Sequence, residues 1–290
     1  ILVCDIGGGT TDLSLIGVTE GKSQLQLERL AVGDHLLLGG DNMDIALARM
    51  VEARLTKGGR LDAQRWHTLT HLCRVAKEDL FADVNRPSVT VTLTGRGSSV
   101  VGGTLSDTLR RKEVEQIVLE GFFPRVEAEA TPRRSARVGL QEFGLPYASE
   151  AEIPRHVALF LRQHGAANGE AMLKPDVLLF NGGALTPLAI RERIVEVVAS
   201  WFPAANEAAW QPTVLTSTSL DLAVAYGAAY YGLVRRGQGI RIGGGSARAY
   251  YIGLGATGQG STDRYVQALC LVRHGMEEGE EVHLAEPEFA

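Results

Sequence analysis

The chain has 290 residues, 45% of them hydrophobic and 22% charged, which is the composition of an ordinary globular protein with room for one large domain or several small ones. Its formal net charge of −5 argues against a nucleic-acid surface, and no stretch is apolar over a membrane span, so neither nucleic acid nor a membrane is an expected partner. Three scattered cysteines and the lack of a signal-peptide pattern predict a cytoplasmic protein.

The amino terminus predicts a β-hairpin with glycine at its tip. Ile1–Cys4 is an apolar run typical of a buried strand, Asp5 ends it, and Leu13–Val18 is the returning strand. The tip contains Gly7, Gly8, Gly9 and Thr10. Glycine lets a ligand approach bare backbone N–H groups, and successive N–H groups form a concavity suited to phosphate oxygens. Asp5 lies where a carboxylate can orient water around Mg²⁺. The alternative interpretation of the whole motif is a tight glycine hairpin that binds no ligand.

The following stretch predicts a strand and two helices. Lys22–Val32 alternates like a strand, and after a loop Asp41 or Asn42 caps a helix over Met43–Leu55. A second helix is predicted over Asp62–Asp83. Its core stripe is Leu69, Leu72, Cys73, Ala76 and Leu80, and another face carries Arg74, Lys77, Glu78 and Phe81.

The middle of the chain predicts a hairpin and two further helices. Pro87–Leu93 and Ser98–Thr104 alternate as paired strands joined by a glycine turn. Helices are predicted over Arg111–Arg125 and Ile153–His164, with an irregular, partly basic loop over Glu127–Tyr147 between them.

A second glycine motif follows a buried strand near residue 176. The strand runs from Asp176 into Gly182 and Gly183, and Pro187 then opens a helix that ends at Trp201. Glycines at a helix N-terminus again let a ligand meet bare backbone. A strand–turn–helix connection without a ligand fits this pattern equally.

The carboxyl-terminal part begins with a short strand over Pro212–Thr216 and a helix rich in small residues over Ser217–Gly232. Arg235–Ser246 is a glycine-rich linker. Two strands are predicted after it, over Tyr250–Leu254 and Tyr265–Val272.

The sequence Asp-Ile-Gly-Gly-Gly-Thr-Thr-Asp-Leu-Ser, beginning at Asp5, resembles the second phosphate motif of the DnaK-type (seventy-kilodalton heat-shock) chaperones. These belong to the actin, sugar-kinase and heat-shock ATPase superfamily. The Gly-Gly-Asp-Asn-Met-Asp segment, the Asn-Gly-Gly turn of an adenosine loop and Asp-Leu-Ala-Val-Ala-Tyr-Gly-Ala-Ala are similar to later segments of that family, in the family's order. The resemblance spans residues 1–236.

The resemblance implies an α/β fold: an actin-like ATPase lobe with a ribonuclease H-like mixed sheet and a small inserted α/β subdomain at about 34–105. Residues 1–236 would be the second half of an actin-like nucleotide-binding domain, 237–248 a linker, and 249–290 the start of a β-rich domain that binds peptide. The chain starts inside a strand without Met, so we expect a fragment that begins at the second phosphate motif.

The resemblance also implies ATP or ADP and Mg²⁺ as cofactors. The matching positions are Asp5, Gly7, Gly8, Gly9, Thr10, Lys77, Gly182, Gly183 and Asp221. The hairpin would hold the phosphates, with Asp5 reaching the metal through water, and Lys77 would reach the ribose or base. Gly182 and Gly183 would back the adenosine, and Asp221 would close that pocket.

Several positions depart from the family, among them Arg74, Phe81 and Thr186. Arg74 replaces a ribose-binding Glu, Phe81 replaces a Ser, and Thr186 stands where an Arg stacks on the base. We hypothesise that Phe81, with Arg74 beside it, supplies the replacement platform for the base. The alternative is that Phe81 packs into the subdomain core.

The predicted function is the ATP-binding part of a DnaK-type chaperone-like ATPase, with nucleotide, unfolded peptide and co-chaperones as the partners that the resemblance implies. No second Asp-x-Gly-Thr hairpin occurs in the chain, so this chain alone is not expected to hydrolyse ATP. The alternatives are a non-catalytic nucleotide sensor or scaffold of the same fold, and another superfamily phosphotransferase such as a sugar kinase or polyphosphate phosphatase.

Overall fold

The computed structural model describes residues 1–22, 24–94, 104–133, 150–167, 169–202, 210–256 and 266–283. The chain divides into two compact units. The first comprises Ile1–Leu13 and Gly33–Gly227, and the second comprises Ser14–Val32 and Ala228–Ala290.

A parallel set of strands forms the centre of the first unit. β6 (Val177–Asn181) lies between β1 (Leu2–Ile6) and β7 (Thr213–Leu215) and runs parallel to both. β2 (Thr11–Glu20) begins on the other side of β1. Residues of β1 alternate between buried and half-buried, so Asp5 lies within this strand and does not end it as predicted, because the buried Ile6 continues the core face.

Two helices contact each other beside this sheet, α4 (Ile153–Ala167) and α5 (Leu188–Ser200). The turn after β6 first forms a short 3₁₀ helix over Gly183–Leu185, and Pro187 is the N-cap of α5. The core here is made of apolar side chains from the sheet and both helices: Leu2, Phe180, Leu161, Ile190, Ile194 and Val197.

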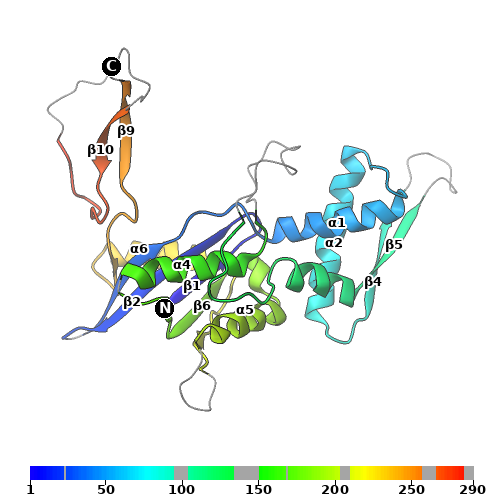
Figure 1. The fold of residues 1–290 in the computed structure, drawn as a ribbon, viewed down its shortest axis with the longest axis horizontal. Helices are drawn as coiled ribbons and strands as arrows, with labels where there is room; N and C mark the ends of the chain where they lie inside the picture. Colours follow the sequence, from blue (N-terminus) through cyan, green and yellow to red (C-terminus); the bar gives the residue numbers. More distant parts are fainter. Residues whose placement is uncertain are drawn as a thin grey trace. The chain divides into compact units, whose positions relative to one another are not determined.

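A helical subdomain is formed by residues 40–110 of the first unit. It contains α1 (Gly40–Leu55), α2 (Ala63–Ala82) and the antiparallel pair β4 (Ser88–Leu93) and β5 (Leu105–Arg110). Figure 1 shows these four elements gathered together, and α1 contacts both α2 and β5. Of the predicted α2 stripe, Leu72 is only half-buried, and the other four residues are buried.

The return strand of the hairpin is β5, later in the chain than the predicted Ser98–Thr104. Residues 98–103 lie outside the described part of the chain. β5 pairs in register from Ser88↔Arg110 to Leu93↔Leu105 and buries Leu109 in the subdomain core. Leu105 and Leu109 supply the apolar side chains of β5 that alternate along the strand.

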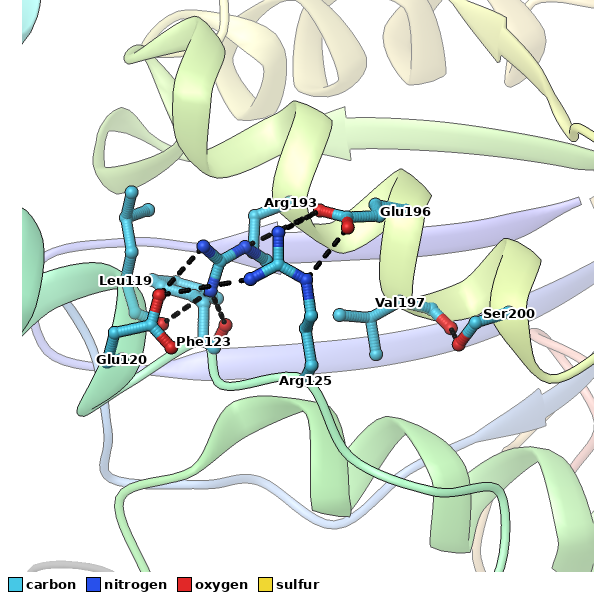
Figure 2. A network of polar contacts seen from close by, with 8 residues as sticks. All are labelled: Leu119, Glu120, Phe123, Arg125, Arg193, Glu196, Val197 and Ser200. Atoms are coloured by element: carbon cyan, nitrogen blue, oxygen red, sulfur yellow. Dashed lines mark hydrogen bonds and ion pairs between the residues drawn. The ribbon is translucent and has the colours of Figure 1, made fainter.

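The single helix predicted over Arg111–Arg125 is two shorter pieces, α3 (Arg111–Glu115) and a π-helical turn, η1 (Gln116–Glu120). The last carbonyl groups of this segment accept hydrogen bonds from α5 (Figure 2). Arg193, which is 9% exposed, donates from Nη1 to Leu119 O at 3.2 Å and to Phe123 O at 3.1 Å. Its Nη2 atom also donates to Glu120 Oε1 at 2.9 Å. The buried guanidinium therefore replaces helical partners that these carbonyls lack.

An Arg–Glu pair beside this network adds a second link to α5. Arg125 donates to both carboxylate oxygens of Glu196, at 2.8 and 2.9 Å. Of the irregular stretch predicted over Glu127–Tyr147, residues 134–147 lie outside the described part of the chain, and 127–133 form no regular element.

The second unit contains the rest of β2 and, in its described residues, four other strands. β3 (Leu25–Val32) pairs antiparallel with β2, from Ser14↔Val32 to Glu20↔Leu25. Part of the predicted linker is ordered, because β8 (Ile242–Gly243) pairs parallel with β3. β9 (Tyr250–Ala256) and β10 (Val266–Val272) form an antiparallel hairpin. Parallel and antiparallel pairs together confirm the predicted mixed α/β sheet.

α6 (Ala223–Val234) begins six residues after the predicted Ser217. Ser219 Oγ accepts a hydrogen bond from Leu222 N at 3.3 Å, and Leu222 O accepts the first helical bond from Tyr226 N. Serine competes in this way for backbone donors and delays the helix.

Glu52 fixes the connection between α1 and α2. Its buried carboxylate accepts hydrogen bonds from Leu61 N at 2.8 Å, Arg49 at 2.8 Å and Arg60 at 3.2 Å. Burial alone would raise the pKa of Glu52, but these hydrogen bonds outweigh it and lower the pKa below its usual value of 4.5.

Because the folded state holds the pKa of Glu52 below the unfolded value, the ionised carboxylate stabilises the fold above pH 4.5, and this contribution is lost as the pH falls through the folded pKa. We expect Glu52→Gln to lower the free energy of unfolding at pH 7 by about 1–3 kcal/mol and to flatten its decline in acid. Urea unfolding between pH 3 and 7 measures both effects. Glu115→Gln, at a 40% exposed carboxylate, is the matched control, and equal curves for the two variants would contradict the expectation.

Candidate functional site

A cavity of about 590 Å³ opens in the first unit, where segments distant in the sequence converge. They are the hairpin tip, the start of α1, one face of α2, the turn after β6 and the residues before α6. Among the residues predicted from sequence, those that line the cavity are Gly8, Arg74, Lys77, Phe81, Gly183 and Asp221. The fold therefore gathers both glycine motifs and the polar face of α2 around one space.

The other predicted residues do not line the cavity: Asp5, Gly7, Gly9, Thr10 and Gly182. Gly7 N donates to Thr10 O at 2.9 Å and closes the hairpin turn. At Gly182, where φ is +89°, an added Cβ would lie 2.8 Å from Asp5 Oδ1, so the end of β6 packs against the end of β1. At Gly9 an added Cβ would meet no atom within 4 Å, so this residue faces open space.

The start of α1 holds the hairpin tip in place. Gly40 N donates to Gly7 O at 3.0 Å, and Asp41 N donates to Gly8 O at 2.7 Å. These two bonds satisfy first-turn N–H groups that a helix leaves without partners. A Cβ at Gly39 would lie 2.5 Å from Gly8 O, so the close approach of helix and hairpin requires glycine there. The tip is therefore positioned by the helix.

This contact also moves the helix start. The sequence predicts a helix from Met43 with Asp41 or Asn42 as cap, but α1 begins at Gly40 and Gly39 is the N-cap. Asn42 still contributes, because its Oδ1 accepts a hydrogen bond from Gly39 N at 2.9 Å. The carbonyl groups of the hairpin accept hydrogen bonds from the first N–H groups of α1, a role expected of the cap side chain, and the helix therefore starts earlier than predicted.

Asp44, which the sequence did not single out, and Asp41, which was expected there only as a helix cap, organise the charges of the cavity. Asp44, 1% exposed, accepts a hydrogen bond from Arg74 Nε at 2.7 Å and lies 2.6 Å from Lys77 Nζ. Asp41 also pairs with the guanidinium of Arg74. The hydrogen bond to Asp44 raises the pKa of Arg74. Asp41 and Asp44 lie three positions apart at a helix start, which is the one sequence signal that could have pointed to them.

Two acidic side chains lie near the base of the hairpin. Burial, and secondly the charge of Asp12, raise the pKa of Asp5. Asp12 in turn lies 2.7 Å from His35 Nδ1. This arrangement concentrates negative charge next to the hairpin. Within the described residues, no group of three or more His, Cys, Asp or Glu side chains is placed to hold a metal ion directly.

The hairpin, its pinning helix and the whole subdomain fall within residues 1–131, and this stretch matches the family described as Hsp70 protein. Residues 1–131 belong to the Hsp70 family. The Hsp70-family stretch supplies Gly8, Arg74, Lys77 and Phe81 to the cavity, and Gly183 and Asp221 come from beyond it. The mixed α/β structure is consistent with an Hsp70 actin-like ATPase lobe.

Several relatives carry the name chaperone protein HscA homolog. The one from Delftia acidovorans is 32% identical over 144 residues, covering 43% of this chain and 22% of the relative. The one from Verminephrobacter eiseniae is 29% identical over 220 residues, covering 67% and 34%. The one from an Acidovorax species is 33% identical over 151 residues, covering 44% and 23%. The chain thus spans only between 22% and 34% of the length of these relatives.

Across the described parts of the chain, no helix combines the length and the apolar character needed to cross a bilayer.

Proposed function

We propose that this chain is the ATP-binding part of a DnaK-type chaperone-like ATPase. The observation that carries the proposal is the cavity itself, which brings Gly8, Lys77, Gly183 and Asp221 together from four segments of the chain. A cavity with a few convergent polar groups at the edge of an α/β sheet is the usual form of a small-molecule site. Its volume of about 590 Å³ suits a nucleotide-sized ligand.

In this proposal the glycine hairpin holds the phosphates. The carbonyl groups of Gly7 and Gly8 are engaged by α1, so an anion at the tip meets backbone N–H groups and the positive end of a helix. Asp5 and Asp12, the two carboxylates near the hairpin, would face a hydrated Mg²⁺ bound beside the phosphates. Asp5 would hold the ion through water, and the ion would neutralise phosphate charge.

The adenosine would lie on the opposite side of the cavity. Asp221 Oδ1 lies 2.7 Å from the position of a Cβ added at Gly183, so the carboxylate packs against bare backbone at this wall. Leu188, Ile190 and Phe81 add apolar surface for a base. Lys77 is buried next to Asp44 and presents its ammonium group to the ribose or base.

Titration of the protein with MgATP and MgADP by calorimetry tests this function. We expect saturable binding with a dissociation constant in the micromolar range or tighter, and weaker binding once Mg²⁺ is chelated. Lack of binding by both nucleotides would refute the proposal.

The proposal also includes a cytoplasmic location, peptide and co-chaperone partners for the whole protein, and the division into a nucleotide-binding part (1–236), a linker (237–248) and a β-rich part (249–290).

A second candidate is a nucleotide sensor or scaffold that binds ATP without hydrolysing it. The observation that favours it is the acidic character of the cavity, where Glu78 adds a third carboxylate near Asp41 and Asp44. Single-turnover assays with radiolabelled ATP separate the candidates, because a sensor binds nucleotide and releases no phosphate.

Substitution of Phe81 tests whether this side chain stacks on the base or packs into the subdomain core. It lines the cavity and is half-buried, so Phe81→Ala is expected to weaken ATP binding about tenfold to a hundredfold through loss of base stacking, with little loss of stability. Calorimetry and thermal unfolding of the same variant give the two readouts. A melting temperature lower by several degrees with unchanged ATP affinity would assign Phe81 to the core.

A further inference from the structure

Arg74 is engaged by two carboxylates. Its guanidinium is held by Asp44 and Asp41 at the start of α1. The carboxylate of Asp41 lies next to the hairpin, since its Oδ1 atom is 3.3 Å from the position of a Cβ added at Gly8. Arg74 and Phe81 are two helical turns apart on α2, so the guanidinium belongs to the hairpin end of the cavity.

The two carboxylates that hold Arg74 differ in their surroundings. Asp44 is 1% exposed, so its release from Arg74 would leave a buried charge with Lys77 as its only ion-pair partner among the described residues. Asp41 is 49% exposed and pairs with Arg74 alone among the ion pairs of the described residues, so water can replace its contact at little cost. Asp44 therefore fixes the guanidinium, and Asp41 occupies its outer face.

We propose that Asp41 is an internal competitor for the phosphate groups of the nucleotide. The Asp41 carboxylate binds the outer face of Arg74 next to Gly8, which is the place of an anion in the proposed function on which this inference rests. An incoming phosphate displaces Asp41 and takes Arg74 as a charge-assisted donor, while Asp44 keeps the guanidinium in position. Asp41 thereby lowers the affinity for nucleotides in proportion to their phosphate charge.

Asp41→Asn tests this competition, because it removes the charge and keeps the size of the side chain. We expect the variant to bind MgATP about three- to tenfold more tightly, with a smaller gain for MgADP and none for adenosine. Arg74→Gln should weaken ATP binding, and adding Asp41→Asn to Arg74→Gln should bring no further gain. The measurement is calorimetry at low and high salt.

Asp79→Asn is the matched control. Asp79 lies on the same helix as Arg74, and its side chain is 44% exposed. It pairs with Arg86 at 2.8 Å and does not line the cavity. It should leave ATP affinity unchanged. Unchanged or weaker ATP binding by Asp41→Asn, or an equal gain for adenosine, would overturn the proposal.

Pyrophosphate with Mg²⁺ separates this inference from the nucleotide function. If the unaltered protein binds no nucleotide but Asp41→Asn gains pyrophosphate binding that Arg74→Gln abolishes, the competitor is supported and the ATP function is refuted. If the unaltered protein binds ATP and Asp41→Asn changes neither ATP nor pyrophosphate affinity, the function stands and the competitor is refuted. If neither protein binds either ligand, both are refuted.

Discussion

Replacing Gly8 with valine is expected to abolish measurable ATP binding, a loss of at least a hundredfold or about 2.7 kcal/mol. Gly8 lines the cavity at the hairpin tip, where phosphate oxygens would approach bare backbone. A β-branched side chain there occupies the space of the phosphate. The atoms nearest to an added Cβ belong to the Asp41 side chain, at 3.3 Å or more, which can rotate away, so the fold should remain intact.

Calorimetry with MgATP and circular dichroism of the same sample provide the two measurements. Gly59→Val is the control, because Gly59 lies in the exposed turn at the other end of α1 and an added Cβ there meets only Thr56. ATP affinity that survives in Gly8→Val would remove the hairpin from the binding site. Loss of the circular dichroism signal would instead assign Gly8 to the fold.

Gly182→Ala is expected to produce the largest loss of stability, with the free energy of unfolding lower by about 2–4 kcal/mol. The residue has a φ of +89°, which alanine adopts only with strain. Its Cβ would also lie 2.2 Å from Ile6 O, inside the contact between the ends of β6 and β1. Neither backbone can move without disturbing the parallel pairing between Leu2↔Leu178 and Asp5↔Asn181.

Urea unfolding measures this difference, and Gly9→Ala is the matched control at the same end of the sheet. An added Cβ at Gly9 meets nothing within 4 Å, so its stability should stay within about 0.5 kcal/mol of the unaltered protein. If Gly182→Ala unfolds at the same urea concentration as Gly9→Ala, the close packing of β6 on β1 is wrong.

Regular elements with a strong periodic pattern were predictable from sequence. The apolar run of β1, the alternation of β3 and the helical stripe of α2 led to the right type of element, and the glycine motif led to the right family. Boundaries were less predictable, because distant residues set them. α1 starts early since carbonyls of Gly7 and Gly8 accept its first bonds, and η1 ends where Arg193 meets its carbonyls.

The site was predictable in part for the same reason. Gly8 and Lys77 were identified from their motif, and both line the cavity. Asp44 was not identified, because its role depends on its pairing with Arg74 and Lys77, which lie on another helix some thirty positions later. Pairing across helices leaves no periodic signal in a single sequence. The same pairing places the guanidinium of Arg74 at the hairpin end of the cavity, which could not be inferred from the face of α2 on which Arg74 lies.

The two hydrogen bonds from α1 to the hairpin tip have a mechanical consequence. Gly40 N and Asp41 N are part of a helix that continues for four turns into the subdomain, so the tip and the subdomain form one stiff lever. A small rotation of that lever displaces the carbonyls of Gly7 and Gly8 by the same angle. A partner that binds the far end of the subdomain and rotates it would therefore also change the spacing of the backbone N–H groups at the tip.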